Sequence, residues 1–239
     1  MIGRADIHIH TTASDGFDSV QDILDYTAAL GTLDVVAITD HDVLDASLWA
    51  YEHRARYPFE IIPGVEVSTA EGHMLALWVQ KPIPMGMSLA ETAAAIHEQD
   101  GIAILAHPFE LTITFKVFMH YLQQPASLLS TGIDAIEVYN AASPTPASNP
   151  LARRLAEQIK LPMTGGSDAH SLGGIGCGIT RFNGRTADEL RREITATQTD
   201  GEGHWWPLRE YLRYIPSYSK MDKLNSAASK GKRLLPFLH

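Results

Sequence analysis

The sequence predicts an α/β protein whose parallel sheet closes, or nearly closes, into a barrel. Short apolar runs alternate with amphipathic segments of 10 to 15 residues, the pattern of strand–helix units. Seven or eight such units fit into about 200 residues, the length of a small β/α barrel. Barrels of this kind gather their chemistry at the carboxyl ends of the strands, so the residues that follow each apolar run are candidates for a functional site.

The bulk composition is that of an ordinary globular protein, with 239 residues of which 45% are hydrophobic and 20% charged. No apolar run approaches the ~20 residues needed to cross a bilayer, and the first residues lack the charged leader and apolar core of a signal peptide. The single cysteine, Cys177, excludes an internal disulfide and suits a reducing compartment. We therefore expect a cytoplasmic protein without membrane contact.

The net charge of −9 is unevenly distributed along the chain. Residues 205–239 hold seven Lys or Arg against two acidic residues, which gives this segment +5 and leaves −14 for the first 204 residues. On this basis we predict a barrel domain over 1–204 and a basic, aromatic C-terminal extension over 205–239. The extension would be a solvated tail, a cover for the barrel mouth, or a docking segment.

The first expected strand begins near Ala5 and carries His8 and His10, and the chain then continues into a polar loop. Side chains alternate along a strand, so His8 and His10 share one face. Asp15 follows in a turn marked by a serine and a glycine. A helix with a serine N-cap is then expected over 19–30, ending at a glycine that can take the left-handed conformation.

The next two strands follow the same plan. Apolar residues 33–38 form a strand that is followed directly by Asp40 and His41, and a helix is expected near 45–57. Another strand runs to about residue 68 with Glu66 near its end. A tight turn leads to His73 at the start of a paired strand.

The second half of the body repeats the alternation. A capping box at Ser88 opens a helix that reaches about residue 100, and a strand over 102–106 ends at His107. After a strand over 133–139, a helix capped by Asn149 is expected, with Pro150 at its first position. The remaining expected elements are a strand entering Asp168 and His170, a last strand near 178–182, and a capped helix over 186–198.

Nine potential metal ligands lie at or near the strand ends, and six of the eleven histidines are among them. Imidazoles and carboxylates that converge in a dry core are costly unless they are paired, and divalent cations compensate them. Mixed His and carboxylate ligands without cysteine suit Zn, Mn or Fe. Nine ligands exceed what one or two ions need. The residues are His8, His10, Asp15, His41, Glu66, His73, His107, Asp168 and His170.

Six short motifs of this chain, in their order, resemble those of the PHP (polymerase and histidinol phosphatase) family of metal-dependent phosphoesterases. They span about residues 3–182 and are His8-Ile9-His10, Ile38-Thr39-Asp40-His41, Gly64-Val65-Glu66-Val67-Ser68, Ala106-His107-Pro108, Ile136-Glu137-Val138-Tyr139-Asn140 and Gly166-Ser167-Asp168-Ala169-His170. The resemblance implies a distorted seven-stranded β/α barrel, similar to a TIM barrel, with a trinuclear site at its mouth.

The resemblance also implies how three divalent ions would be shared. One ion would be held by His8, His10, Glu66 and Asp168. A second would be held by His73 and His107, with Glu66 bridging to the first. The third would be held by Asp15, His41 and His170. The position of Asp15 varies among relatives.

The activity implied is hydrolysis of a phosphoester by a metal-activated water, with a small phosphorylated metabolite or nucleotide as substrate. Asp40 is a candidate for orienting an imidazole. Arg153, Arg154 and Lys116 are candidates for contacting phosphate, although nothing in their spacing selects them. The native metal and the oligomeric state are left open.

Two alternative functions compete with a phosphatase. The first is a single-strand nuclease or exonuclease of the same chemistry, which the acidic body disfavours and the basic, aromatic extension favours. The second is an amidohydrolase, which also uses a His-x-His after its first strand. The histidine beside Asp168 and the one at position 41 do not fit a two-metal amidohydrolase pattern.

Overall fold

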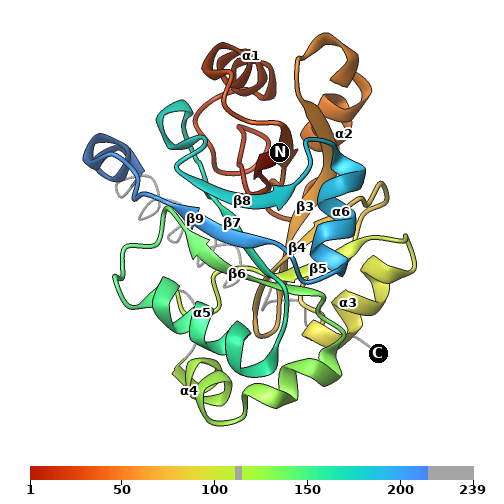
Figure 1. Cartoon of the computed structure of the whole chain (residues 1–239), viewed down its shortest axis with the longest axis vertical. Helices are drawn as coiled ribbons and strands as arrows, with labels where there is room; N and C mark the ends of the chain where they lie inside the picture. Colours follow the sequence, from red (N-terminus) through yellow and green to blue (C-terminus); the bar gives the residue numbers. More distant parts are fainter. Residues whose placement is uncertain (111–114, 215–239) are drawn as a thin grey trace, which may run out of the picture. The chain divides into compact units, whose positions relative to one another are not determined.

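The computed structural model describes residues 1–110 and 115–214, in which nine strands form one sheet in the order β7-β6-β5-β4-β3-β2-β1-β8-β9 (Figure 1). The strands are β1 (Ile2–Asp6), β2 (Val35–Ile38), β3 (Glu60–Thr69), β4 (Gly72–Leu77), β5 (Ile102–Leu105), β6 (Ala135–Asn140), β7 (Met163–Gly166), β8 (Gly178–Asn183) and β9 (Asp200–Gly203). The α-helices are α1 (Val20–Leu30), α2 (Asp45–Glu52), α3 (Leu89–His97), α4 (Phe115–Gln123), α5 (Ser148–Ile159) and α6 (Ala187–Thr195). Short 3-10 helices lie at Arg54–Arg56, Pro125–Thr131 and Leu172–Gly174.

The sheet is mixed rather than purely parallel. The pairs β1–β2, β2–β3, β5–β6 and β6–β7 are parallel, whereas β4 pairs antiparallel with β3 and β5, and β8 pairs antiparallel with β1 and β9. The tight β3–β4 turn forces this reversal, because a hairpin can join only antiparallel strands. The barrel-like α/β fold predicted from the sequence is confirmed, and the β3–β4 hairpin is its main distortion.

The barrel nearly closes because β7, at one edge of the sheet, contacts β8, which lies next to the other edge strand, β9. The Thr180 hydroxyl of β8 donates to the Gly165 carbonyl of β7 at 2.8 Å and accepts from the Gly165 N–H at 2.9 Å. A Cβ added to Gly178 would lie only 2.0 Å from the carbonyl oxygen of Gly166. Glycine at position 178 is therefore what lets β8 approach β7 so closely.

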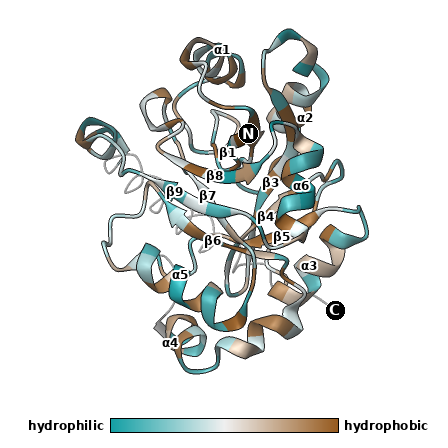
Figure 2. Ribbon diagram, viewed as in Figure 1, coloured by the Kyte–Doolittle hydropathy of each residue, from teal (hydrophilic) through white to brown (hydrophobic). Residues whose placement is uncertain are grey.

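The hydrophobic core has an inner part, inside the barrel, and outer parts between the strands and the surrounding helices. One cluster of buried side chains joins residues of β1–β6 and β8 with Leu190 and Ile194 of α6, so it fills the inside of the barrel. Alternate residues on the same strands face outward, where α1 and α2 cover one region and α3, α4 and α5 cover another. Figure 2 shows the matching pattern on the outer helices, with hydrophilic and hydrophobic residues on different sides of α5 and α6.

Three helix starts follow the sequence signals. The Ser19 hydroxyl accepts from the backbone of Asp22, and α1 ends at Gly31 with φ of 60°. Full capping boxes open α3 at Ser88 and α6 at Thr186. The predicted start of α5 is wrong by two residues, since the N-cap is Ala147 and the first helical residue is Ser148. Asn149 lies inside the helix instead of capping it, because its side chain bonds the backbone N–H and carbonyl of Asn140 in β6.

Two strands differ from the sequence prediction. The first strand was expected to carry His8 and His10, but it ends at Asp6, and residues 8–10 pair instead with the loop after β7 through His10 N–H to the Ala169 carbonyl at 2.9 Å. The short strand β9 was not predicted, since it holds two glycines and depends on its partner β8.

The chain divides into two compact units, Met1–Trp206 and Pro207–His239. Residues 215–239, most of the predicted basic extension, lie outside the described residues, so the role of the extension and the boundary at residue 204 stay predictions. Among residues 1–110 and 115–214, no helix has both the length and the apolar character needed to cross a membrane.

Candidate metal centre

All nine predicted ligand residues meet at one end of the barrel. The strands β1, β2, β3, β5 and β7 end there, and the start of antiparallel β4 brings His73 to the same place. Each of the nine side chains has a ring nitrogen or carboxylate oxygen within 3.2 Å of such an atom of another member. Residues up to 162 apart in the sequence thus form one cluster, called here the nine-residue cluster.

One group of the cluster surrounds Oε2 of Glu66. Nε2 of His8 and Nε2 of His10 each lie 3.2 Å from this oxygen. The same two nitrogens lie 3.5 and 3.1 Å from Oδ1 of Asp168. Two imidazoles and two carboxylates therefore face a common point.

A second group gathers at the other oxygen of Glu66. Oε1 lies 3.0 Å from Nδ1 of His73 and 2.9 Å from Nε2 of His107. The two oxygens of Glu66 thus face different groups of imidazoles. Nδ1 of His41 also lies 3.1 Å from Oε2, so five histidines contact this one carboxylate.

The third group forms around Asp15 in the loop after β1. Oδ2 of Asp15 lies 3.1 Å from Nε2 of His170 and 3.9 Å from Nε2 of His41. Oδ1 lies 3.6 Å from Nδ1 of His10. These four residues also satisfy the spacing of a metal-binding group, with one ligand atom from each within 4.8 Å of the others.

Neighbouring imidazoles lower the pKa of two cluster carboxylates against the effect of burial. Burial works to raise the pKa of Glu66, but the imidazoles of His41, His8 and His73 hold that pKa well below its usual range. For Asp168, burial is again outweighed by neighbouring imidazoles, and the pKa is lowered. The cluster therefore offers ionised oxygens to a cation.

The imidazoles of the cluster differ in the direction in which their pKa is shifted. Burial lowers the pKa of His10, but the carboxylates of Asp168 and Glu66 raise it to about 10. Burial dominates at His41 and lowers its pKa to about 4. Protons on some rings thus balance the carboxylates, and divalent cations could take over this role because they bind deprotonated ligands.

The hydrogen bonding of the atoms at the centre of the cluster indicates whether the cluster fits metal ions. Within the described part of the chain, Nε2 of His8, both ring nitrogens of His10 and Oε2 of Glu66 are buried and make no hydrogen bond. Buried polar atoms are normally hydrogen-bonded. A set of such atoms that faces one point without a hydrogen bond is therefore arranged as the ligands of a metal ion would be. Nitrogen and oxygen donors of this type suit Zn, Mn or Fe, and the residues present fit such ions.

The carboxylates after β2 bond to backbone and hydroxyl groups. Oδ1 of Asp40 accepts from Thr11 N–H at 2.7 Å and from the Ser14 hydroxyl at 2.6 Å, and Oδ2 accepts from the Thr11 hydroxyl. The sequence had suggested that Asp40 orients an imidazole. Its hydrogen bonds go instead to the loop that carries Asp15. Asp42 accepts from the Ser68 N–H of β3.

Three residues that contact the cluster were given no role at the site from the sequence, although Glu137 and Asn140 lie within one of the six motifs. Glu137 accepts from Nδ1 of His8 at 2.9 Å, Asn140 donates to Asp168 at 3.1 Å, and Glu110 lies 3.1 Å from Nδ1 of His107. A signal was present for Glu137, since a charged residue in the middle of an apolar buried strand needs a partner. Glu110 had no comparable signal.

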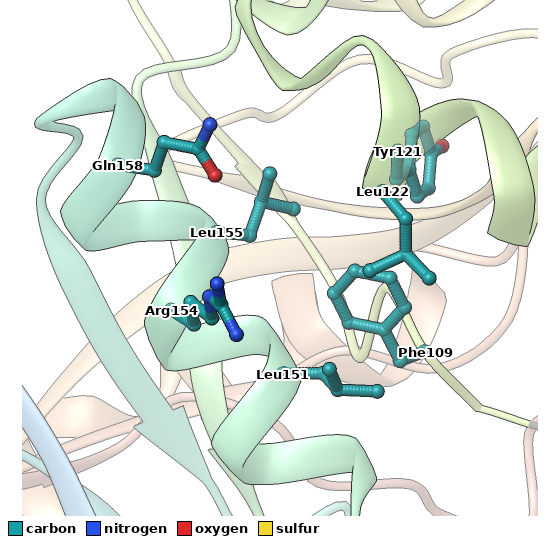
Figure 3. Close-up of a pocket in the computed structure, with 7 residues that line it drawn as sticks. All are labelled: Phe109, Tyr121, Leu122, Leu151, Arg154, Leu155 and Gln158. Atoms are coloured by element: carbon teal, nitrogen blue, oxygen red, sulfur yellow. The ribbon is translucent and has the colours of Figure 1, made fainter.

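The cationic candidates for phosphate contact lie apart from the cluster. Arg153 pairs with Asp200 at 2.8 Å and donates to the Gly201 carbonyl, which joins α5 to β9. Arg154 lines a cavity of about 230 Å³ between α4 and α5, together with Phe109, Tyr121, Leu122, Leu151, Leu155 and Gln158 (Figure 3). Lys116 lies exposed on α4. No member of the nine-residue cluster lines this cavity.

The fold and the cluster agree with the comparison with known families. The family model described as PHP domain matches residues 6–135, and the one described as PHP-associated matches residues 146–199. The first match alone spans more than half of the chain. The chain therefore belongs to the PHP family of metal-dependent phosphoesterases, hydrolases that act on ester bonds.

Several curated proteins are similar in sequence. An uncharacterised protein of Methanocaldococcus jannaschii is 30% identical over 152 residues, which are 58% of this chain and 82% of that protein. A 5'-3' exoribonuclease of Haemophilus influenzae is 32% identical over 108 residues, 44% of this chain and 39% of that protein. A phosphoribosyl 1,2-cyclic phosphate 1,2-diphosphodiesterase of Eggerthella lenta is 32% identical over 85 residues, 33% of this chain and 32% of that protein.

Solved structures share the fold at low sequence identity. A two-domain protein of Bacteroides vulgatus containing a predicted PHP-like metal-dependent phosphoesterase superposes with a TM-score of 0.66 at 18% identity, covering 85% of this chain and 65% of that one. A lesion-specific endonuclease of Pyrococcus furiosus superposes with a TM-score of 0.58 at 19% identity, covering 84% and 58%.

Proposed function

We propose that the nine-residue cluster holds three divalent ions, Mn, Zn or Fe, and hydrolyses the phosphoester of a small phosphorylated metabolite or nucleotide. The observation that carries this proposal is the convergence of nine side chains with nitrogen and oxygen donors from four loops and from strands β3 and β4, with several of the donor atoms buried without a hydrogen bond. The ligands of each ion would be those given by the family resemblance. Such ions, when bound, polarise a phosphoryl oxygen and lower the pKa of a water molecule towards neutrality.

The protein's own residues would prepare this site by fixing ligand atoms. The two oxygens of Glu66 face different groups, which suits a carboxylate shared between two ions. Nδ1 of His170 lies 2.8 Å from the Asp168 carbonyl, and this bond leaves Nε2 directed at Asp15. Ring nitrogens held in this way keep the tautomer that metal binding requires.

The loops around the cluster favour a small substrate over a nucleic acid. The segments that carry or flank the cluster residues contain no Lys or Arg, whereas they hold further carboxylates at Asp18, Asp40, Asp42, Glu71 and Glu110. Their ranges are 11–19, 39–44, 68–73, 106–110, 140–147 and 167–177. A polynucleotide carries a phosphate on every residue and relies on cationic side chains to bind it. Bound ions could neutralise one phosphoryl group, but these loops would repel a long polyanion.

A nuclease of the same chemistry is the second candidate. It is supported by the similarity to the exoribonuclease of Haemophilus influenzae and by the basic residues of 215–239. In this alternative the extension would supply the cations that the loops lack. Truncation after Gly203 would then abolish a salt-dependent affinity for single-stranded oligonucleotides.

The experiment begins with metal analysis of the purified protein. A phosphate-release screen with Mn²⁺ or Zn²⁺ would follow, across sugar phosphates, mononucleotides and oligonucleotides. We expect turnover of a small phosphomonoester or cyclic phosphodiester that is lost in His10→Ala and Asp168→Ala. His97→Ala is the matched control, because His97 lies on α3 and pairs only with Asp134 in the contacts described. Retained turnover in His10→Ala, or turnover of oligonucleotides alone, would contradict the proposal.

A further inference from the structure

Glu137 is a buried carboxylate in the middle of β6. Its two oxygens contact two residues of the nine-residue cluster, His8 and His107, and the neighbouring Asn140. Oε1 lies 2.9 Å from Nδ1 of His8. Oε2 accepts from the backbone N–H of His107 at 3.0 Å and from Nδ2 of Asn140 at 3.1 Å. Glu137 is 1% exposed, so these bonds do not compete with water.

The bond to His8 fixes which ring nitrogen carries the proton. With the Glu137 oxygen as the acceptor of this bond, Nδ1 of His8 is the donor. Nε2 of His8 is then left without a proton in the neutral ring and points at Oε2 of Glu66, 3.2 Å away. This is the tautomer that a metal ligand needs.

The other oxygen supports two ligand residues with unusual backbones. His107 has φ of 23° and Asp168 has φ of 50°, both in the left-handed region that non-glycine residues rarely occupy. Glu137 holds the His107 N–H directly. It reaches Asp168 through Asn140, whose Nδ2 donates to both carboxylates. Oδ1 of Asn140 accepts from the N–H groups of Ala142 and Ser143, which fixes the orientation of the amide.

Glu137 and His8 pack closely against the backbone of Gly166. A Cβ added to Gly166 would lie 2.7 Å from Oε1 of Glu137 and 2.5 Å from Cβ of His8. The absence of a side chain at Gly166 therefore makes the His8–Glu137 pair possible. Gly166 is the last residue of β7, just before the loop that carries Asp168.

We propose that Glu137 is a positioning residue for the metal centre, setting the tautomer of His8 and the backbone of His107 and, through Asn140, the carboxylate of Asp168. The inference rests on the metal ligands of the proposed function but not on its substrate. It predicts that Glu137 controls metal affinity without contacting a metal.

Two substitutions separate position from charge. In Glu137→Gln one oxygen is replaced by an NH2 group, which is a donor. That NH2 group would face either Nδ1 of His8 or the N–H groups of His107 and Asn140, so in either orientation two donors face each other. Glu137→Asp keeps the charge but withdraws the carboxylate by one methylene, too far to bond His8 and His107 together. Both variants lose the geometry, and only the first loses the charge.

Thr180→Val is the matched control. Its hydroxyl makes buried bonds to Gly165 at the β7–β8 junction, and the hydrogen bonds described for it reach no cluster residue. We expect this variant to unfold at a lower temperature while binding metal like the wild type. It reports what a purely structural loss near the site would do.

The experiment is a calorimetric titration of the metal-free protein with Mn²⁺ and an absorption spectrum of the Co²⁺-loaded form. We expect Glu137→Gln and Glu137→Asp each to weaken at least one Mn²⁺ site by about 10- to 100-fold and to alter the Co²⁺ absorption bands, with Thr180→Val unchanged in both. Wild-type affinity in either Glu137 variant, or an equal loss in Thr180→Val, would overturn the inference. A wild type that binds Mn²⁺ but cleaves no phosphoester would refute the proposed function alone.

Discussion

The indole N–H of Trp206 donates to the carbonyl of Ser167 at 2.8 Å, directly before the loop that carries Asp168. The same indole lies edge-on to the imidazole of His170, with 5.8 Å between ring centroids. The backbone N–H of Trp206 also bonds the Ala141 carbonyl. A residue from the end of the first compact unit thus ties together the loops after β6 and β7.

This contact predicts an optical signal for metal binding. Because Trp206 is buried against His170, a metal ion at that imidazole should change the tryptophan fluorescence. We expect a saturable change on adding Mn²⁺ or Co²⁺ to the metal-free protein, and its loss in Trp206→Phe. Trp49→Phe is the control, since Trp49 stacks on His53 of the α2 end. An unchanged signal in Trp206→Phe would contradict the assignment of His170.

A second prediction concerns the loop that carries Asp15. Asp40→Ala would leave the buried Thr11 N–H and the hydroxyls of Thr11 and Ser14 without their acceptor. We expect a loss of about 1–3 kcal/mol in the free energy of unfolding and weaker binding of the ion at Asp15. Denaturant titration and metal equivalents per chain measure the two effects.

Asp42→Asn is the control for that loop. Asn tolerates the backbone of position 42, where φ is 55°, and keeps an acceptor for Ser68. It should leave metal binding unchanged. If Asp40→Ala kept every metal equivalent at wild-type affinity, Asp40 would have no part in holding Asp15.

A third prediction tests barrel closure. A methyl group at Gly178 would meet the Gly166 carbonyl at 2.0 Å, so β8 must move away from β7. Gly178→Ala should lower the free energy of unfolding by about 1–3 kcal/mol. Gly86→Asn is the comparison, because a Cβ there meets no atom within 4 Å and Asn accepts its positive φ. Equal thermal midpoints for the two variants would show that the close approach is not required.

A fourth prediction concerns metal removal. Ions that bind only the folded protein stabilise it, by about 2.7 kcal/mol for one site at a free concentration of 100 times its Kd. The thermal midpoint should fall when a chelator removes the metal and recover when Mn²⁺ is restored. His10→Ala should show a much smaller recovery. A midpoint that ignored the chelator in a protein shown to have held metal would contradict folding-linked binding.

The sequence was informative about the cluster because its ligands follow a rule of position. Parallel strands end at one rim, so residues such as His41, His107 and Asp168 could be placed together without knowing the barrel's exact closure. His73 was harder, since it begins a strand. It reaches the rim because β4 runs antiparallel to β3, which the tight turn at Gly72 had indicated.

The supports of the cluster could not be predicted in the same way. Glu137 and His8 are 129 residues apart, and their bond depends on the space left by Gly166. Asp40 was expected at an imidazole, but it bonds the loop of Thr11, because loop conformation decides where a short side chain reaches. Strand β9 forms only against β8 and has no periodicity of its own. These features arise from tertiary packing rather than from local pattern.

Anomalous diffraction from crystals grown with Mn²⁺ tests the central claim most directly. The account predicts three peaks: one among His8, His10 and Asp168, one beside His73 and His107, and one beside Asp15 and His170, with Glu66 adjoining the first two. Crystals of the same protein that showed no peak within the nine-residue cluster would contradict it.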